Sequence, residues 1–143
     1  MNLTRHADLS LRVLLYVGLH GDRLSSVREV SERYGVSRNH LVKVAHHLVR
    51  LGFLETVRGR HGGLRLARPA EEITVGEVIR GTEPSFDLVE CFAPETDTCA
   101  ITPACRLKGV LHGALRRFLE ELDRHTLADL LVHRGRLLPL LDE

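Results

Sequence analysis

Two short helical segments separated by Gly35 restrict the fold of this chain more than any other feature of its sequence. Residues 27–34 follow Ser26 and carry Glu29 three positions after it, which is the pattern of a helix N-cap with its capping box. Residues 38–51 repeat apolar side chains at helical spacing. Two short helices joined by a tight glycine turn predict a helix-turn-helix.

The residues after the second helix predict a β-hairpin. Residues 53–57 and 64–67 each alternate apolar and polar side chains, as strands with one buried face do. The segment between them, 58–63, is rich in glycine and basic residues, which is typical of a flexible turn. We therefore expect a mainly α fold with a small β-hairpin wing, that is, a winged helix-turn-helix.

Longer helices flank this unit. Residues 4–20 are apolar on most sides, which predicts a buried helix. Capping boxes at Thr74 and Thr126 predict two short helices. After Cys105 apolar residues recur every three or four positions for roughly twenty residues, which predicts a helix of about 30 Å. Such a helix is longer than a small domain needs, so we expect it to form a dimer interface.

Charge divides the chain into two unlike halves. The net charge of the 143 residues is only +1, but residues 1–80 hold 13 Lys and Arg against 8 Asp and Glu. Residues 81–143 hold 7 against 11, and residues 81–105 contain five acidic residues and no basic one. A basic N-terminal half is suited to a polyanion such as DNA.

The helix-turn-helix and wing supply candidate DNA-contacting residues. The first residues of the second helix contact base edges in the major groove, where Arg and Lys match guanine and Asn matches adenine. Hydroxyls at the start of the preceding helix suit a phosphate, and a basic wing tip suits a narrow minor groove. The candidates are Ser25, Ser26, Ser37, Arg38, Asn39, His40, Lys43, Arg58, Arg60 and His61.

Three cysteines, Cys91, Cys99 and Cys105, lie in or at the end of residues 81–104, a stretch with three prolines and little periodicity. A loop of this length is uncommon in a compact domain unless a function requires it. An odd number of clustered cysteines argues against a disulfide scaffold. Their spacing is wider than that of the usual zinc pairs and favours an iron–sulfur cluster. Zinc binding and thiol redox chemistry remain alternatives.

Three thiolates leave a tetranuclear cluster one ligand short. Within the loop and the helix after it, Glu90, Asp97 and His112 are the nearest candidates for a further ligand. The first helix of a partner subunit offers two more, His6 and Asp8.

These patterns together resemble the Rrf2 superfamily of winged-helix regulators over nearly the whole chain. The resemblance rests on SVREVSERYGVSRNHLVKVAHHLVRLGFLETVRGRHGGLRLARP, on ITVGEVIRGTEP and on the three cysteines. Within the superfamily, LVECF, ITPAC and LDRHTLADLL are similar to the nitric-oxide-sensing iron–sulfur repressors. A sister group of general iron–sulfur-status regulators would carry a ligand histidine shortly after the third cysteine, where this chain has Lys108.

The resemblance implies a homodimeric repressor whose iron–sulfur cluster, usually 4Fe–4S with 2Fe–2S as the alternative, is bound by Cys91, Cys99 and Cys105. It implies that reaction with nitric oxide releases the double-stranded DNA operator. It also implies that a carboxylate of the partner subunit completes the cluster, and Asp8 matches that position. Arg12, one turn further on, would orient Asp8. The interval between the first two cysteines is longer than expected for these repressors.

Other classes of protein are disfavoured. No phosphate-binding loop, convergent acid pair or Ser-His-Asp order stands out, so we do not expect an enzyme. No apolar run approaches 20 residues, and the first ten residues are too polar for a signal peptide, so we expect a cytoplasmic protein without a membrane segment. The expected division is a DNA-binding domain at 1–80, a cluster-binding loop at 81–105, and a dimerisation helix with a short tail helix at 106–143.

Overall fold

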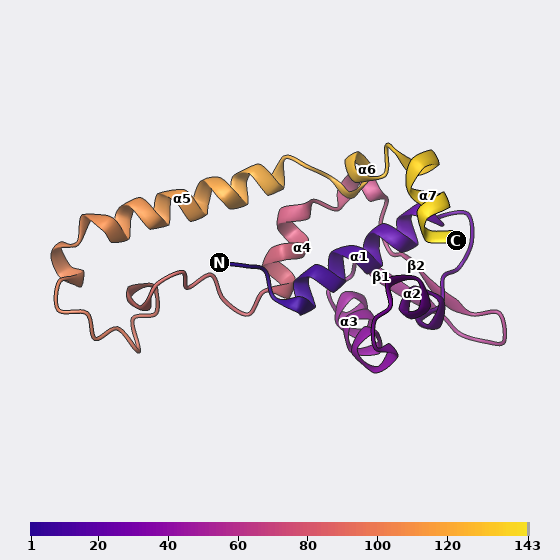
Figure 1. The fold of residues 1–143 in the computed structure, drawn as a ribbon, viewed down its shortest axis with the longest axis horizontal. Coiled ribbons are helices and arrows are strands. Elements are labelled where there is room, and N and C mark those ends of the chain that lie inside the picture. Colours follow the sequence, from indigo (N-terminus) through magenta and orange to yellow (C-terminus); the bar gives the residue numbers. More distant parts are fainter. Residues whose placement is uncertain (143) are drawn as a thin grey trace.

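A computed structural model describes residues 1–142 (Figure 1). All of the predicted helices and both strands are present, and the bounds of the elements in the winged helix lie within about two residues of those expected. In chain order the elements are α1 (Arg5–Leu19), α2 (Val27–Tyr34), α3 (Arg38–Arg50), β1 (Leu54–Val57), β2 (Gly63–Leu66), η1 (Ala70–Glu72), α4 (Val75–Thr82), η2 (Glu90–Phe92), η3 (Thr102–Ala104), α5 (Arg106–Asp123), α6 (Leu127–Leu130) and α7 (Arg134–Asp142).

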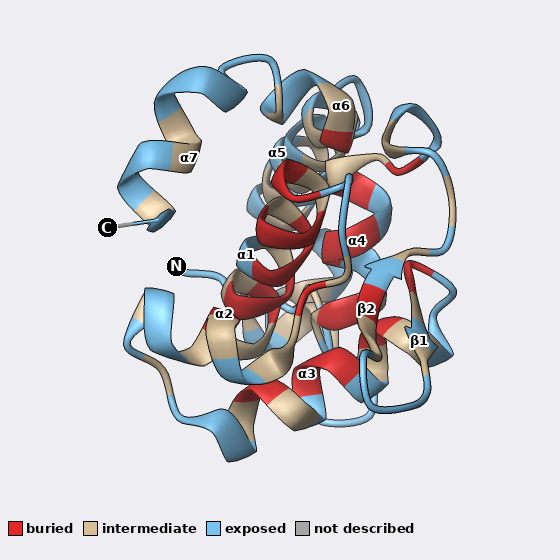
Figure 2. Ribbon diagram, turned by 90° about the vertical axis from the view of Figure 1, so that its right-hand side faces the viewer, coloured by how far each residue is buried: buried red, intermediate tan, exposed pale blue. Residues whose placement is uncertain are grey.

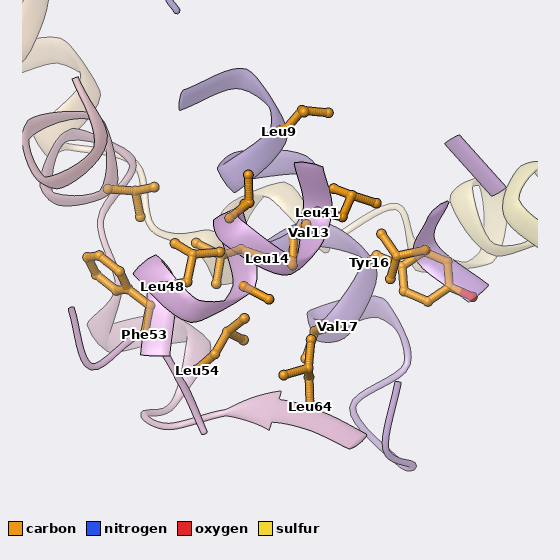
Figure 3. Packing of buried hydrophobic residues seen from close by; sticks show 14 of the residues in the cluster. Leu9, Val13, Leu14, Tyr16, Val17, Leu41, Leu48, Phe53, Leu54 and Leu64 are labelled. Atoms are coloured by element: carbon orange, nitrogen blue, oxygen red, sulfur yellow. The ribbon is translucent and has the colours of Figure 1, made fainter. Parts of the chain in front are cut away.

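Helix α1 occupies the centre of the hydrophobic core. It is buried along most of its length, as its apolar composition predicts, and Figure 2 shows this burial. Its side chains pack against the helix-turn-helix and the hairpin (Figure 3). Burying each leucine or valine of this core stabilises the fold by about 1.5–3 kcal/mol. The largest contributors include Leu9, Leu14, Tyr16, Val17, Val30, Leu41, Val44, Leu48, Leu54 and Ile73.

The helix-turn-helix is formed by local interactions that the sequence predicts. The capping box before α2 is complete, since the side chains of Ser26 and Glu29 each bond the backbone N–H of the other. Gly35 ends α2 in the left-handed conformation with φ of 62°, which glycine adopts without strain. Ser37 lies at the N-cap of α3, but its hydroxyl makes no capping hydrogen bond. Among residues 1–142 the hydroxyl of Ser37 therefore has no capping partner and can bond another molecule.

The other two predicted capping boxes differ from each other. Thr126 and Asp129 form the complete reciprocal box before α6. At α4 only the first half of the box forms, in which the Thr74 hydroxyl accepts from the Glu77 amide at 3.1 Å. The Glu77 carboxylate instead accepts from Arg68 at 2.8 Å. This tertiary ion pair replaces the second half of the box. The capping box predicted at Thr74 is therefore only partly formed.

The wing is a two-stranded antiparallel hairpin, with Leu54 of β1 opposite Leu66 of β2. Alternation places Leu54 and Leu64 in the core, as the sequence predicts. The hairpin is joined to the segment before α2 by a backbone bridge. The Ser25 amide donates to the Leu64 carbonyl at 3.0 Å, and the Leu64 amide donates to the Ser25 carbonyl at 2.7 Å. We call residues 4–82, which include the wing, the head.

Helix α5 extends away from the head, and residues 84–105, which contain only short 3-10 turns, run from α4 to its far, N-terminal end (Figure 1). We call residues 84–105 the cysteine loop. No residue of α5 is buried. Three of its large apolar side chains, Leu107, Val110 and Phe118, are 61%, 65% and 40% exposed. The helix therefore presents an apolar surface that the chain itself does not cover.

The C-terminal end of α5 is fastened to α4. Arg80 and Asp123 form a bidentate ion pair, with one N–H···O distance of 2.8 Å. Just beyond α5, the Leu127 amide donates to the Ile73 carbonyl at 2.7 Å. Gly76 permits this approach, because a Cβ atom at that position would collide with the Asp123 carboxylate.

The tail contains one helix more than predicted. Residues 131–133 form a turn, so α6 and α7 are separate, and α7 contains Pro139. Arg134 contacts Asp22 at 3.2 Å and His20 contacts Asp142 at 3.3 Å, which holds α7 against the end of α1. Within residues 1–142, no helix combines the length and the apolar character needed to span a lipid bilayer.

We predict that Gly76→Ala lowers the free energy of unfolding by about 1–3 kcal/mol, because the added methyl overpacks the contact between α4 and α5. Thermal and urea unfolding measure this effect. The matched control is Gly135→Ala in α7, where an added Cβ meets no atom within 4 Å. If both variants unfold like the wild type, the close approach at Gly76 does not stabilise the protein.

Candidate nucleic-acid interface and cysteine loop

The first turns of α3 present a polar surface over an apolar base. Leu41, Val44 and Leu48 are buried against the core, which fixes the orientation of the helix. The opposite face exposes Ser37, Arg38, Asn39 and Lys43, with His40 half-buried. Five predicted DNA-contacting residues therefore share one accessible region, in the position expected of a recognition helix.

A groove continues this surface toward the hairpin. It is lined by Lys43, His46, Val49 and Arg50 from α3 and by Thr56 from β1. Arg50 and Thr56 were not among the predicted DNA-contacting residues. Lys43, His46 and Arg50 are spaced by three and four positions, which places them on one face of the helix. This spacing is the sequence signal from which the groove residues of α3 could have been predicted.

The wing tip has unpaired basic side chains. Arg58, Arg60 and His61 are exposed. Among the described residues, none of the three takes part in a side-chain hydrogen bond or an ion pair, whereas Arg65 further along the hairpin pairs with Glu55. Unpaired cations on a turn are available to contact phosphates.

Two of the predicted DNA-contacting residues have hydroxyls that are buried or already engaged within the chain. Ser25 is 0% exposed, because its backbone bridge to Leu64 turns the residue into the interior, and its hydroxyl has no hydrogen-bond partner among residues 1–142. Ser26 uses its hydroxyl and its amide on Glu29. Neither hydroxyl is therefore free to bind a phosphate.

At the start of α1, Asp8 and Arg12 form the predicted ion pair. Arg12 donates to the two Asp8 oxygens at 2.9 Å and 3.1 Å, and both side chains are about half exposed. The pair lines an open hollow together with Leu3, Arg5 and Val36. The Asp8 carboxylate therefore faces a space that another molecule can enter.

The three cysteines are free thiols of the cysteine loop, which lies away from the head (Figure 1). Cys91 lies in η2 and Cys105 at the N-cap of α5, and both are half-buried. Cys99 lies between them on an exposed segment. The three thiols therefore lie in the part of the cysteine loop that leads into α5, and none lies in residues 84–90.

Carboxylates of the loop bond the residues that flank the cysteines. Glu90 accepts from the amide and the hydroxyl of Thr98, both at 2.6 Å. The hydrogen bond from the Thr98 hydroxyl, together with that from its amide, lowers the pKa of the Glu90 carboxyl. Asp97 accepts from the Cys99 amide at 3.0 Å and from the Thr102 hydroxyl at 3.1 Å. Both carboxylates hold the loop together.

His112, another candidate ligand by sequence, is stacked on Phe92. The ring centroids are 3.8 Å apart and the rings are nearly parallel, at 8°. Since Phe92 follows Cys91 directly, this stack fastens the first cysteine to α5.

The donor set agrees with an iron–sulfur cluster in its chemistry. Three unpaired thiols on one loop are soft ligands of the kind that such clusters take. In the described part of the chain, no group of three His, Cys, Asp or Glu side chains is assembled around one point. Asp8 lies in α1 of the head, whereas the cysteines belong to the cysteine loop, which extends away from the head (Figure 1), so a single subunit does not bring the four predicted ligands together.

Comparison with known proteins decides the family. The model of the Rrf2 family, described as iron-dependent transcriptional regulators, matches residues 3–133. The chain belongs to the Rrf2 family. It is a transcriptional regulator and not an enzyme, in agreement with the description of its family and the names of its curated relatives.

Curated relatives of this Rrf2-family chain are named HTH-type transcriptional regulator NsrR. The relative from Shouchella clausii is 51% identical over 142 residues, which cover 99% of this chain and 95% of the relative. The relative from Bacillus subtilis is 44% identical over 142 residues, covering 99% and 97% of the two chains.

Solved structures confirm the winged-helix fold. The cysteine regulator CymR of B. subtilis superposes with a TM-score of 0.75 at 21% identity, covering 93% of this chain and 98% of CymR. IscR of T. potens superposes with a TM-score of 0.71 at 26% identity, covering 92% and 86%.

In the Rrf2-family head, Glu29 joins α1 to α2. Its carboxylate accepts from the Tyr16 hydroxyl at 3.0 Å and from Arg23 at 2.7 Å, in addition to the cap at Ser26. Burial alone would raise the pKa of Glu29. The hydrogen bonds outweigh burial, and the pKa lies below its usual value.

A lowered pKa means that ionised Glu29 stabilises the fold above the pKa of the unfolded chain, and that this stability is lost as the pH falls through the folded pKa. We predict that Glu29→Gln costs about 1–3 kcal/mol at pH 7 and much less at pH 3, measured by urea unfolding. The control, Glu32→Gln, removes an exposed carboxylate whose contact with Arg28 is 3.7 Å. An equal cost of Glu29→Gln at both pH values would contradict this account.

Proposed function

We propose that this protein is a homodimeric, cytoplasmic repressor whose affinity for a double-stranded DNA operator is controlled by an iron–sulfur cluster that senses nitric oxide. The observation that carries the proposal is the separation of the donor set: three free thiols on one loop, and a carboxylate presented at an open hollow on the head. Residues 1–80 bind DNA in this proposal, residues 81–105 bind the cluster, and residues 106–143 form the dimer.

The uncovered surface of α5 supports dimerisation. A second copy of α5 would bury Leu107, Val110 and Phe118, which are exposed in the single chain. A two-fold dimer presents two recognition helices to successive major grooves, so the operator would be a palindrome with half-sites about one helical turn apart, or a multiple of that.

Charge supports contact between the cysteine loop and the partner's head. Residues 81–105 carry five acidic side chains and no basic one. The hollow beside Asp8 is lined by Arg5 and Arg12. Opposite charges favour this docking, and the docked loop would bring Cys91, Cys99 and Cys105 toward the partner's carboxylate.

Cys91, Cys99 and Cys105 would hold the cluster, with Asp8 of the other subunit completing the ligand set and Arg12 orienting the carboxylate. An iron–sulfur cluster supplies an iron that reacts with nitric oxide, and a carboxylate ligand is exchanged more readily than a thiolate. Release of Asp8 would free the loop from the head. A change from mostly bound to mostly free DNA needs a coupling of about 3–5 kcal/mol. A 4Fe–4S cluster is proposed, with 2Fe–2S as the alternative.

We predict that the anaerobically purified protein contains iron and acid-labile sulfide and that Asp8→Ala retains the cluster but loses it faster on exposure to a chelator. Iron and sulfide analysis with the absorption spectrum measures the cluster content, and the decay of the spectrum in chelator measures cluster loss. Stopped-flow kinetics measure the reaction of each variant with nitric oxide. The matched control is Asp22→Ala, which removes an exposed carboxylate at the other end of α1. Colourless protein with one zinc per chain would favour a zinc or thiol sensor instead, and unchanged kinetics in Asp8→Ala would remove Asp8 from the site.

We predict that Arg60→Ala weakens operator binding and reduces the slope of log K against log salt by about one unit, because one phosphate contact is lost. Fluorescence anisotropy at several salt concentrations measures the slope. Arg65→Ala is the control, since Arg65 lies on the same hairpin but is paired with Glu55. A wild-type slope in Arg60→Ala would show that the wing tip does not contact DNA.

A further inference from the structure

A hydrogen bond between two histidines joins the start of α1 directly to the recognition helix. His6 Nε2 and His47 Nδ1 are 2.7 Å apart, and the contact is partly buried. The ring centroids are 5.0 Å apart and the rings are tilted by 37°. His6 is the second residue of α1, and His47 lies in the second half of α3. The two helices are therefore linked by a polar contact in addition to the apolar packing of the core.

The first turn of α1 is also bonded to the residue that immediately precedes the cysteine loop. Glu83, the residue that ends α4, accepts from the Thr4 amide at 2.7 Å and from the Thr4 hydroxyl at 3.1 Å. Thr4 in turn caps α1 through the Ala7 amide at 3.1 Å. A continuous series of contacts therefore runs from the beginning of the cysteine loop, through the first turn of α1, to His47 on α3.

Because His47 lies far along α3 from its base-contacting end, a small tilt of the helix at the contact with His6 displaces that end by a larger distance. About nine residues, or roughly 14 Å of helix, separate His47 from Arg38 at the base-contacting end. A tilt of about 5° around His47 moves that end by about 1 Å. A displacement of this size is enough to break hydrogen bonds to base edges, which weaken steeply outside a narrow range of distance.

We propose that His6 is a positioning residue for DNA binding, and that its hydrogen bond to His47 transmits the state of the first turn of α1 to the recognition helix. This inference rests on the proposed function, because Asp8, the carboxylate proposed to bind the partner's cluster, lies two residues after His6 on the same turn. Capture of Asp8 by the partner's loop fixes the first turn of α1, and His6 passes that constraint to α3.

The test compares operator affinity with and without the cluster. The quantity measured is the ratio of the Kd of the chelator-treated protein to the Kd of the cluster-loaded protein, by fluorescence anisotropy under anaerobic conditions. We expect a wild-type ratio of about 100. His6→Phe keeps an aromatic ring but removes the hydrogen bond, and it lowers the ratio at least fivefold while the iron content and absorption spectrum stay unchanged.

Three further variants separate positioning from simple loss of stability. His6→Gln retains an amide that can donate to His47 Nδ1, so it restores part of the ratio. His125→Phe, the matched control on the tail, removes a ring whose only side-chain hydrogen bond among the described residues is to Glu121, at 3.2 Å, and it leaves the ratio unchanged. The double variant His6→Phe with His47→Phe is expected to lower the ratio no further than His6→Phe alone.

Hydrogen exchange supplies a readout that does not depend on DNA. Cluster loading is expected to slow amide exchange in residues 38–50 of the wild type and to have little effect there in His6→Phe. If His6→Phe keeps the wild-type ratio of Kd values and the wild-type slowing of amide exchange in residues 38–50, the inference is overturned but cluster control stays intact. If the chelator-treated and the cluster-loaded wild-type proteins bind the operator with the same Kd, both the proposed function and this inference are overturned.

Discussion

Burial of α1 on most of its circumference is the constraint on which the rest of the molecule depends. The recognition helix and the hairpin pack against it on one side, α4 lies along another, and α7 contacts its C-terminal end. A close-packed interior transmits displacement because it contains little free space. A displacement of the first turn of α1 is therefore transmitted to the elements packed against it, which include α3, the hairpin and α4.

The sequence predicted the elements whose ends are set by local chemistry. Ser26 with Glu29, Thr126 with Asp129, and the glycine turn at Gly35 act within a few residues, so pattern alone located them. The Asp8 and Arg12 pair was predictable for the same reason, since residues four apart in a helix are neighbours.

What the sequence missed depends on contacts between distant residues. Ser25 is buried because it pairs with Leu64 on the hairpin, and no local pattern indicates that pairing. Half of the box at Thr74 was lost to an ion pair of Glu77 with Arg68. The His6 and His47 contact joins residues 41 positions apart. In each case a tertiary partner competed with the local arrangement or was invisible to it.

The attachment of α5 at one end only has a consequence for how the length of the chain can vary. Arg80 and Asp123 fasten its C-terminal end, and the cysteine loop leads into its N-terminal end. One residue inserted within α5 would rotate the thiols by about 100° around the helix axis and shift them by about 1.5 Å. One residue inserted in the irregular segment between the cysteines would cause no such rotation. Evolution can therefore lengthen the loop gradually, but can change the helix only in steps that approximate whole turns.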